Sequence, residues 1–214
     1  MPRELFDTVL SLPLEREHEG WITCAMADYF ESVKQEAYVW AVSPNDEATW
    51  PGDEHLFLPG KLFGLQFKRP EIANRHEPKY RRLRWPIGAD PEQFALIKAH
   101  GEIFYCLPTF TNREWWRVSL HHCIIWRPTA RMLVGDVWYD NPAIRGWRGK
   151  LDRHESAFRW GSFIERVQQC DFVPKMTDDN RNDYVQRFRS ILRAAQRREG
   201  EAETVFVINM PIFE

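Results

Sequence analysis

The chain has 214 residues, a net charge of −2, 43% hydrophobic residues and 28% charged residues. Those values are typical of a globular domain, and no apolar run approaches the about 20 residues that cross a bilayer, so we expect no membrane partner. The acidic N-terminal stretch lacks the apolar centre of a secretory signal, and none of the four scattered cysteines forms a CxxC pair, which disfavours a zinc site or a disulfide framework. We therefore expect one domain, residues 1–214, in the cytoplasm.

The first half of the chain predicts one helix followed by short strands. Apolar residues at helical spacing (Ile22, Met26, Tyr29 and Val33) indicate the helix. In chain order the predicted elements are a helix at 15–35, a strand at 36–43, a polar loop at 44–54, a hairpin of strands at 55–58 and 61–68, and a basic loop with one short strand at 81–85.

The second half predicts further alternation of helix and strand. Asp90 is the expected N-cap of a helix, with Pro91 in its first turn, and Asn112 is the expected cap of a shorter one. The elements are helices at 90–101, 112–121, 155–170 and 178–200, and strands at 102–110, 123–126, 131–140 and 204–210. This order predicts the α/β class, a sandwich of helices around a mixed sheet.

The stretch GLQFKRP, residues 64–70, ends one of the predicted core strands with polar residues. Gln66 and Lys68 are two apart, so on a strand their side chains leave on the same face. A buried amide or ammonium costs desolvation energy unless something binds it. The stretch therefore indicates a functional site, whereas a lysine that merely reaches solvent from a strand end is the structural alternative.

Asp53 precedes this strand and suggests what the site could do. A metal-dependent nuclease needs a divalent ion to lower the pKa of the attacking water, and Mg²⁺ prefers carboxylate, carbonyl and water oxygens. An acid at the start of one strand and an acid-x-Lys on the next converge on one side of a sheet. Glu54 is adjacent to Asp53 and competes with it, Asp46 and Glu47 lie farther back, and a solvated acidic loop is the alternative for all four.

With PGD at 51–53 and QFK at 66–68, the sequence resembles the PD-(D/E)XK, or restriction-endonuclease-like, nuclease superfamily. The core of that family is a helix, three antiparallel strands, a helix and a further strand. The resemblance covers about residues 15–110, with 111–214 as a C-terminal elaboration, and implies a three-layer α/β/α sandwich. Gln66 departs from the family's acid, although branches with QxK look similar, and its side-chain carbonyl is a neutral metal ligand.

The resemblance implies a metal-dependent nuclease, with Asp53 and Gln66 as ligands of Mg²⁺ or Mn²⁺ and Lys68 positioning the water or the phosphate. The first helix of the family often contributes a glutamate. Glu19 extends the apolar stripe of the predicted helix by three residues, and Glu15 lies one more turn back. An ordinary first-turn glutamate near the positive end of the helix would look the same.

The segment from Lys68 to Arg84 is basic, with seven Lys or Arg residues against two Glu residues. Within it, Arg69, Lys79, Arg81 and Arg82 are the predicted contacts to a nucleic-acid backbone. We expect DNA to be favoured over RNA. A partner subunit or a homo-oligomer would suit cleavage of both strands, and the resemblance points to bacterial defence against phage.

Two alternatives to a nuclease remain open. The first is a degenerate nuclease fold, which Gln66 would permit, that binds nucleic acid or a protein as a scaffold. The second and weaker alternative is an unrelated α/β protein in which Gln66 and Lys68 merely end a strand. Adjacent histidines at 121 and 122 point to opposite faces of a strand, which disfavours a metal site there. The stretch YCLPTFTNREWW, residues 105–116, carries no chemistry that the sequence alone reveals.

Overall fold

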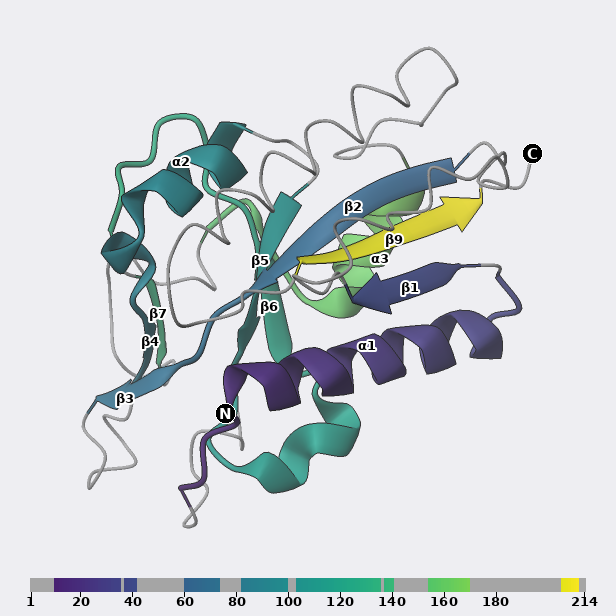
Figure 1. Cartoon of the computed structure of the whole chain (residues 1–214), viewed down its shortest axis with the longest axis horizontal. Coiled ribbons are helices and arrows are strands. Elements are labelled where there is room, and N and C mark those ends of the chain that lie inside the picture. Colours follow the sequence, from purple (N-terminus) through teal and green to yellow (C-terminus); the bar gives the residue numbers. More distant parts are fainter. Residues whose placement is uncertain are drawn as a thin grey trace, which may run out of the picture.

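A computed structural model describes residues 10–35, 37–41, 60–73, 82–99, 103–135, 137–140, 154–169 and 205–211 (Figure 1). Its helices are α1 (Glu15–Ser32), η4 (Ile87–Ala89), α2 (Pro91–Ala99), η5 (Arg113–Val118) and α3 (Trp160–Gln168). Its strands are β1 (Tyr38–Ala41), β2 (Gly60–Phe67), β3 (Glu71–Ala73), β4 (Arg82–Trp85), β5 (Ile103–Pro108), β6 (Cys123–Trp126), β7 (Val137–Asp140), β8 (Ala157–Phe158) and β9 (Val205–Pro211).

The main sheet is mixed, as the sequence predicts. Its six strands lie in the order β1-β9-β2-β5-β6-β8. β2 and β5 are parallel, with Gln66 opposite Tyr105, and every other described pair in this sheet is antiparallel. The α/β class is therefore confirmed, with a parallel pair whose connection contains α2, as parallel strands require a long crossover.

The C-terminal strand β9 occupies a central place in this sheet. It pairs antiparallel with β2 on one side and with β1 on the other. Figure 1 shows it between these two strands, although it comes from the part of the chain expected to elaborate the core. β1 and β2 are thus not neighbours in the sheet.

Helices α1 and α3 cover one face of the sheet. Alternate residues of β2, Phe63, Leu65 and Phe67, pack into one buried cluster with Ile22 of α1 and Phe163 of α3. The ring of Phe163 lies 5.1 Å from that of Phe63, in an edge-to-face arrangement that aromatic pairs prefer. This face is therefore filled by apolar side chains.

Helix α2 and a second sheet lie against the opposite face. The second sheet has the order β3-β4-β7 and is antiparallel. Leu83 of β4 and Phe94 of α2 belong to the same buried cluster as Tyr105 and Trp126 of the main sheet. Tyr105 and Trp126 stack with ring centroids 5.6 Å apart.

Several predicted boundaries need correction. The buried face of α1 consists of His18, Ile22, Met26 and Phe30, which recur every four residues along the helix. The predicted stripe used Tyr29 and Val33 instead of Phe30, and Val33 is exposed. The helix predicted from residue 155 begins at Trp160, since 157–158 pair with β6. The strand predicted at 131–140 is confined to β7, and β3 was not predicted at all.

The described residues include no helix that is both long enough and apolar enough to cross a membrane.

Candidate active site

Gln66 is buried at the end of β2, as the sequence predicts. Only 1% of its surface is exposed. Its amide nitrogen donates a hydrogen bond of 3.3 Å to the carbonyl of Phe67, the next residue in the chain. Its amide oxygen, Oε1, is buried and has no hydrogen-bond partner among the described residues. A buried acceptor without a partner is costly, so this oxygen is a candidate ligand atom.

The side chain of Gln66 leaves the sheet on the face opposite to α1. Successive side chains of a strand alternate, and both Leu65 and Phe67 pack on the α1 face. β2 ends at Phe67, and Lys68 follows it in the chain with a partly buried side chain. A group on α1 can therefore approach Gln66 and Lys68 only around the end of β2.

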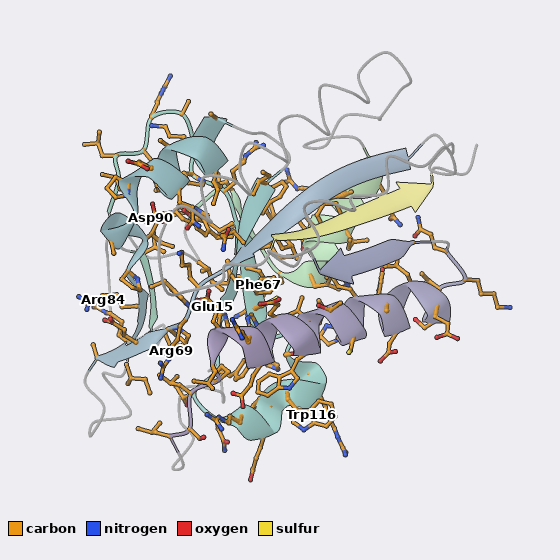
Figure 2. The ribbon with its side chains drawn as sticks, in the orientation of Figure 1. Glu15, Phe67, Arg69, Arg84, Asp90 and Trp116 are labelled. Carbon is orange, nitrogen blue, oxygen red and sulfur yellow. The ribbon has the colours of Figure 1, made fainter. Side chains whose placement is uncertain are left out.

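The first turn of α1 does reach that end. Glu15 Oε2 accepts a hydrogen bond of 2.8 Å from the backbone N–H of Arg69, a residue 54 positions later in the chain. Figure 2 shows Glu15 at the start of α1, near the labelled Phe67 and Arg69. The carboxylate of Glu15 therefore contacts the backbone at the exit of β2.

Glu19 lies one helical turn farther along α1 than Glu15. It lies one residue along from His18, beside the buried stripe, and is partly buried. Its backbone carbonyl accepts a hydrogen bond of 2.8 Å from Thr23 Oγ1, a bond within the helix. Because α1 packs on the other face of the sheet, this placement does not by itself bring Glu19 to Gln66.

His18 is a residue of this region that sequence reasoning missed. Its ring is 5.5 Å from that of Phe67 and 6.0 Å from that of Phe110, both in edge arrangements. Both ring nitrogens are buried without a hydrogen-bond partner among the described residues, and burial lowers the pKa of His18 to about 3. Its position four residues before Ile22 was the available signal.

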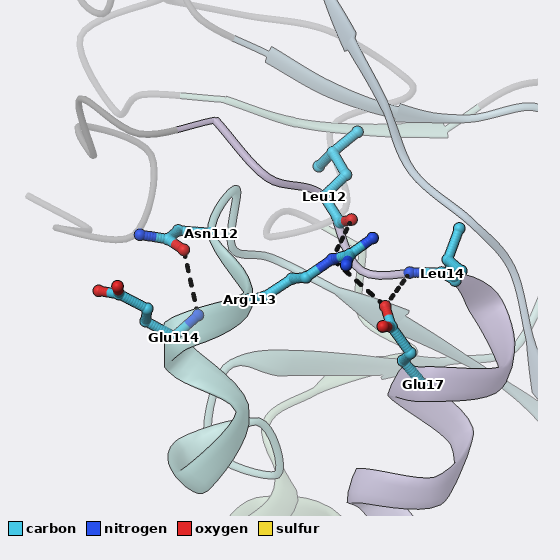
Figure 3. A network of polar contacts seen from close by, with 6 residues as sticks. All are labelled: Leu12, Leu14, Glu17, Asn112, Arg113 and Glu114. Carbon is cyan, nitrogen blue, oxygen red and sulfur yellow. Dashed lines mark hydrogen bonds and ion pairs between the residues drawn. The ribbon is translucent and has the colours of Figure 1, made fainter.

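The same first turn of α1 also binds η5 (Figure 3). Glu17 Oε2 accepts a hydrogen bond of 2.8 Å from the backbone N–H of Leu14 and lies 3.4 Å from Nε of Arg113. Arg113 donates a further bond of 3.3 Å to the carbonyl of Leu12. One helical turn thus connects the exit of β2 with η5.

The basic segment is only partly described. Arg69 is exposed, and Arg82 on β4 is partly buried. Arg84, on the same strand, forms an ion pair with Glu71 of β3. Because of that pair, one of the seven positive charges of the segment is already compensated.

Several predicted site residues lie outside the described residues, namely Asp46, Glu47, Asp53, Glu54, Lys79 and Arg81. Within the described ranges, no three His, Cys, Asp or Glu residues lie together so that they could hold a metal ion.

The cysteines of β5 and β6 are buried. Cys106 and Cys123 both lie in the cluster beneath α1 and α3. Burial, with a smaller contribution from the neighbouring Cys123, raises the pKa of the Cys106 thiol well above its ordinary value. A thiol in that state is a poor nucleophile.

No family model, no curated protein and no solved structure matches this chain.

Proposed function

We propose that the chain is a metal-dependent nuclease of the PD-(D/E)XK type, with Gln66 and Lys68 at its active site. The observation that carries the proposal is the amide oxygen of Gln66, which is buried and has no partner among the described residues. A hard cation accepts such an oxygen as a neutral ligand, and Mg²⁺ or Mn²⁺ bound there would stabilise charge on a phosphate and activate water.

The arrangement of the elements supports the same proposal. The order α1, β1, β2, β3, β4, α2, β5 shares with that superfamily a first helix, strands after it, a second helix and a further strand, although β3 and β4 belong to the second sheet. The packing of α1 and α3 on one face, with α2 on the other, supports a three-layer α/β/α core. The position of β9 between β1 and β2 departs from a simple three-stranded meander, so this strand would be an addition to the family core.

Each residue would have a distinct role. Gln66 and Asp53 would hold the ion, Asp53 coming from the part of the chain that precedes β2. Lys68 would bind the scissile phosphate or orient the water through its ammonium group. The contact of Glu15 with the backbone of Arg69 makes Glu15, beside Glu19, a candidate carboxylate of α1 for the site. Arg69 and Arg82 would contact the sugar-phosphate backbone.

Cleavage of nucleic acid with and without metal tests the proposal. The protein is incubated with supercoiled plasmid, linear duplex, single-stranded DNA and RNA, in Mg²⁺, Mn²⁺ or EDTA. Lys68→Ala is compared with Lys98→Ala on α2, whose ammonium is bound to the carbonyl of Met132. We expect metal-dependent cleavage that Lys68→Ala abolishes and Lys98→Ala retains. Cleavage that is equal in both variants would refute the role of Lys68.

A catalytically degenerate scaffold is the second candidate, and the neutral Gln66 in place of a carboxylate favours it. Such a protein would bind nucleic acid or a partner protein without cutting. Calorimetric titration with Mn²⁺ distinguishes the two functions. A nuclease binds the ion and loses the affinity in Asp53→Ala, whereas a scaffold shows no binding that depends on Asp53.

A further inference from the structure

The outward side of η5 presents an aromatic ring next to a positive charge. Trp116 is 46% exposed. The guanidinium carbon of Arg117 lies 5.1 Å from the centroid of its ring, within the range of a cation–π contact. A half-exposed indole forfeits about half of the energy that its full burial would supply. Figure 2 labels Trp116 on η5, which packs beside α1.

The helix that carries this pair is firmly fixed. The side chain of Asn112 accepts a hydrogen bond of 3.1 Å from the backbone N–H of Glu114 and caps the helix. The neighbouring Trp115 packs edge-on against His122, with ring centroids 4.8 Å apart. Trp116 and Arg117 are therefore displayed by a backbone that is held from both ends, which lowers the entropy that a ligand must remove.

The charges of η5 leave Arg117 available to an anion. Arg113 is already engaged by Glu17 and by the carbonyl of Leu12. Arg117 forms no ion pair with any residue that the structure describes, and the contact it makes there is with the Trp116 ring. An aromatic face with an adjacent cation matches one chemical partner well, a nucleotide whose base stacks while its phosphate is neutralised.

The first turn of α1 links the exit of β2 with the start of η5, the helix that carries this pair. Glu15 binds the backbone of Arg69 at the exit of β2, and two residues later Glu17 binds Arg113 at the start of η5 (Figures 2 and 3). A strand that stacks on Trp116 and continues past the start of α1 would lead toward Lys68.

We propose that Trp116 and Arg117 form a base-stacking contact for single-stranded nucleic acid. The inference rests on the proposed nuclease function and names the form of its substrate. Stacking requires an unpaired base whose face is open, so single strands should bind here better than a duplex.

Fluorescence anisotropy of labelled oligonucleotides tests this in EDTA, where binding is read without cleavage. The probes are a 15-nucleotide oligo-dT, the matching oligo-U and a 15-base-pair duplex. The variants are Trp116→Ala, Trp116→Phe and Arg117→Ala. Leu133→Ala is the control, because Leu133 is 88% exposed and lies in a different surface loop. Circular dichroism confirms that each variant is folded.

We expect Trp116→Ala to weaken single-strand binding at least about fivefold, and Trp116→Phe to retain most of the affinity, because a phenyl ring still stacks. Arg117→Ala should lower the slope of log affinity against log salt by about 0.7, the value for one phosphate contact on a single strand.

Equal affinities of Trp116→Ala and Leu133→Ala, or no preference for single strands, would overturn the inference even if the protein cuts. If single-strand binding depends on Trp116 but the protein cleaves no substrate, the stacking contact is upheld and the proposed nuclease function is refuted.

Discussion

Replacement of His18 by leucine should remove a large part of the acid sensitivity of the fold. Burial between Phe67 and Phe110 lowers the pKa of His18 to about 3, against an ordinary value of 6.5. Below pH 6.5 the unfolded chain therefore binds a proton that the folded chain rejects. The free energy of unfolding falls as the pH falls, and the contribution is fully present only above the unfolded pKa.

The size of this change in unfolding free energy follows from the difference in bound protons between the unfolded and the folded chain. One proton corresponds to about 1.4 kcal/mol per pH unit between the two pKa values. From about pH 7.5 to about pH 5 the folded protein should lose about 2 kcal/mol through His18 alone. At about pH 5 the His18 ring is still neutral in the folded protein. The loss of about 2 kcal/mol therefore depends only on the pKa of His18 in the unfolded chain.

Urea denaturation at both pH values measures the effect. The quantity compared is the change in unfolding free energy between the two pH values, in the natural chain, in His18→Leu and in the control His121→Gln, whose ring is exposed. We expect the change to shrink by about 2 kcal/mol in His18→Leu and to stay the same in His121→Gln. At the higher pH, His18→Leu should be neutral or stabilising, because two unpartnered nitrogens leave the core. An unchanged pH dependence of the unfolding free energy in His18→Leu would refute the claim that His18 is buried in its neutral form.

Three further predictions concern single contacts. Glu15→Ala should speed hydrogen exchange of the Arg69 amide, whereas Glu15→Gln keeps an acceptor and some protection; equal rates would contradict the contact. Asn112→Ala should lower the free energy of unfolding by about 1 kcal/mol, and Asn112→Asp, which can still cap η5, should not. Gln66→Glu should tighten Mn²⁺ binding in calorimetry, because a carboxylate replaces a neutral oxygen; weaker binding would place the ion elsewhere.

The sequence predicts correctly those helices that begin with a capping residue. Asp90 caps α2 with a bond of 2.8 Å to the Gln93 N–H, and Asn112 caps η5, both as expected from residue type. The position of β9 could not be predicted this way. Its pairing with β1 and β2 joins residues far apart in the chain, and the alternation of a strand does not say which neighbours it will have.

The same limit applies to the candidate site. The pattern QFK predicts that Gln66 is buried at a strand end, because apolar residues precede it without a break. It cannot predict which glutamate of α1 meets the strand exit. Glu15 accepts a hydrogen bond from the backbone of Arg69, a contact between residues 54 positions apart that the local apolar stripe does not encode. His18 was overlooked because a histidine at a core position has no distinctive local signal.

The cost of burying Gln66 bears on whether the site is still in use. A buried amide oxygen without a partner destabilises a fold by about 1–3 kcal/mol, and leucine at the same place would avoid that cost. In a protein that never binds an ion there, none of the described residues offsets the cost, so Gln66→Leu should be neutral or stabilising in every buffer. In a nuclease, the natural chain should gain stability from added Mn²⁺, and Gln66→Leu should lose that gain. Thermal unfolding with and without the ion therefore distinguishes an active site from a remnant, independently of whether the substrate is known.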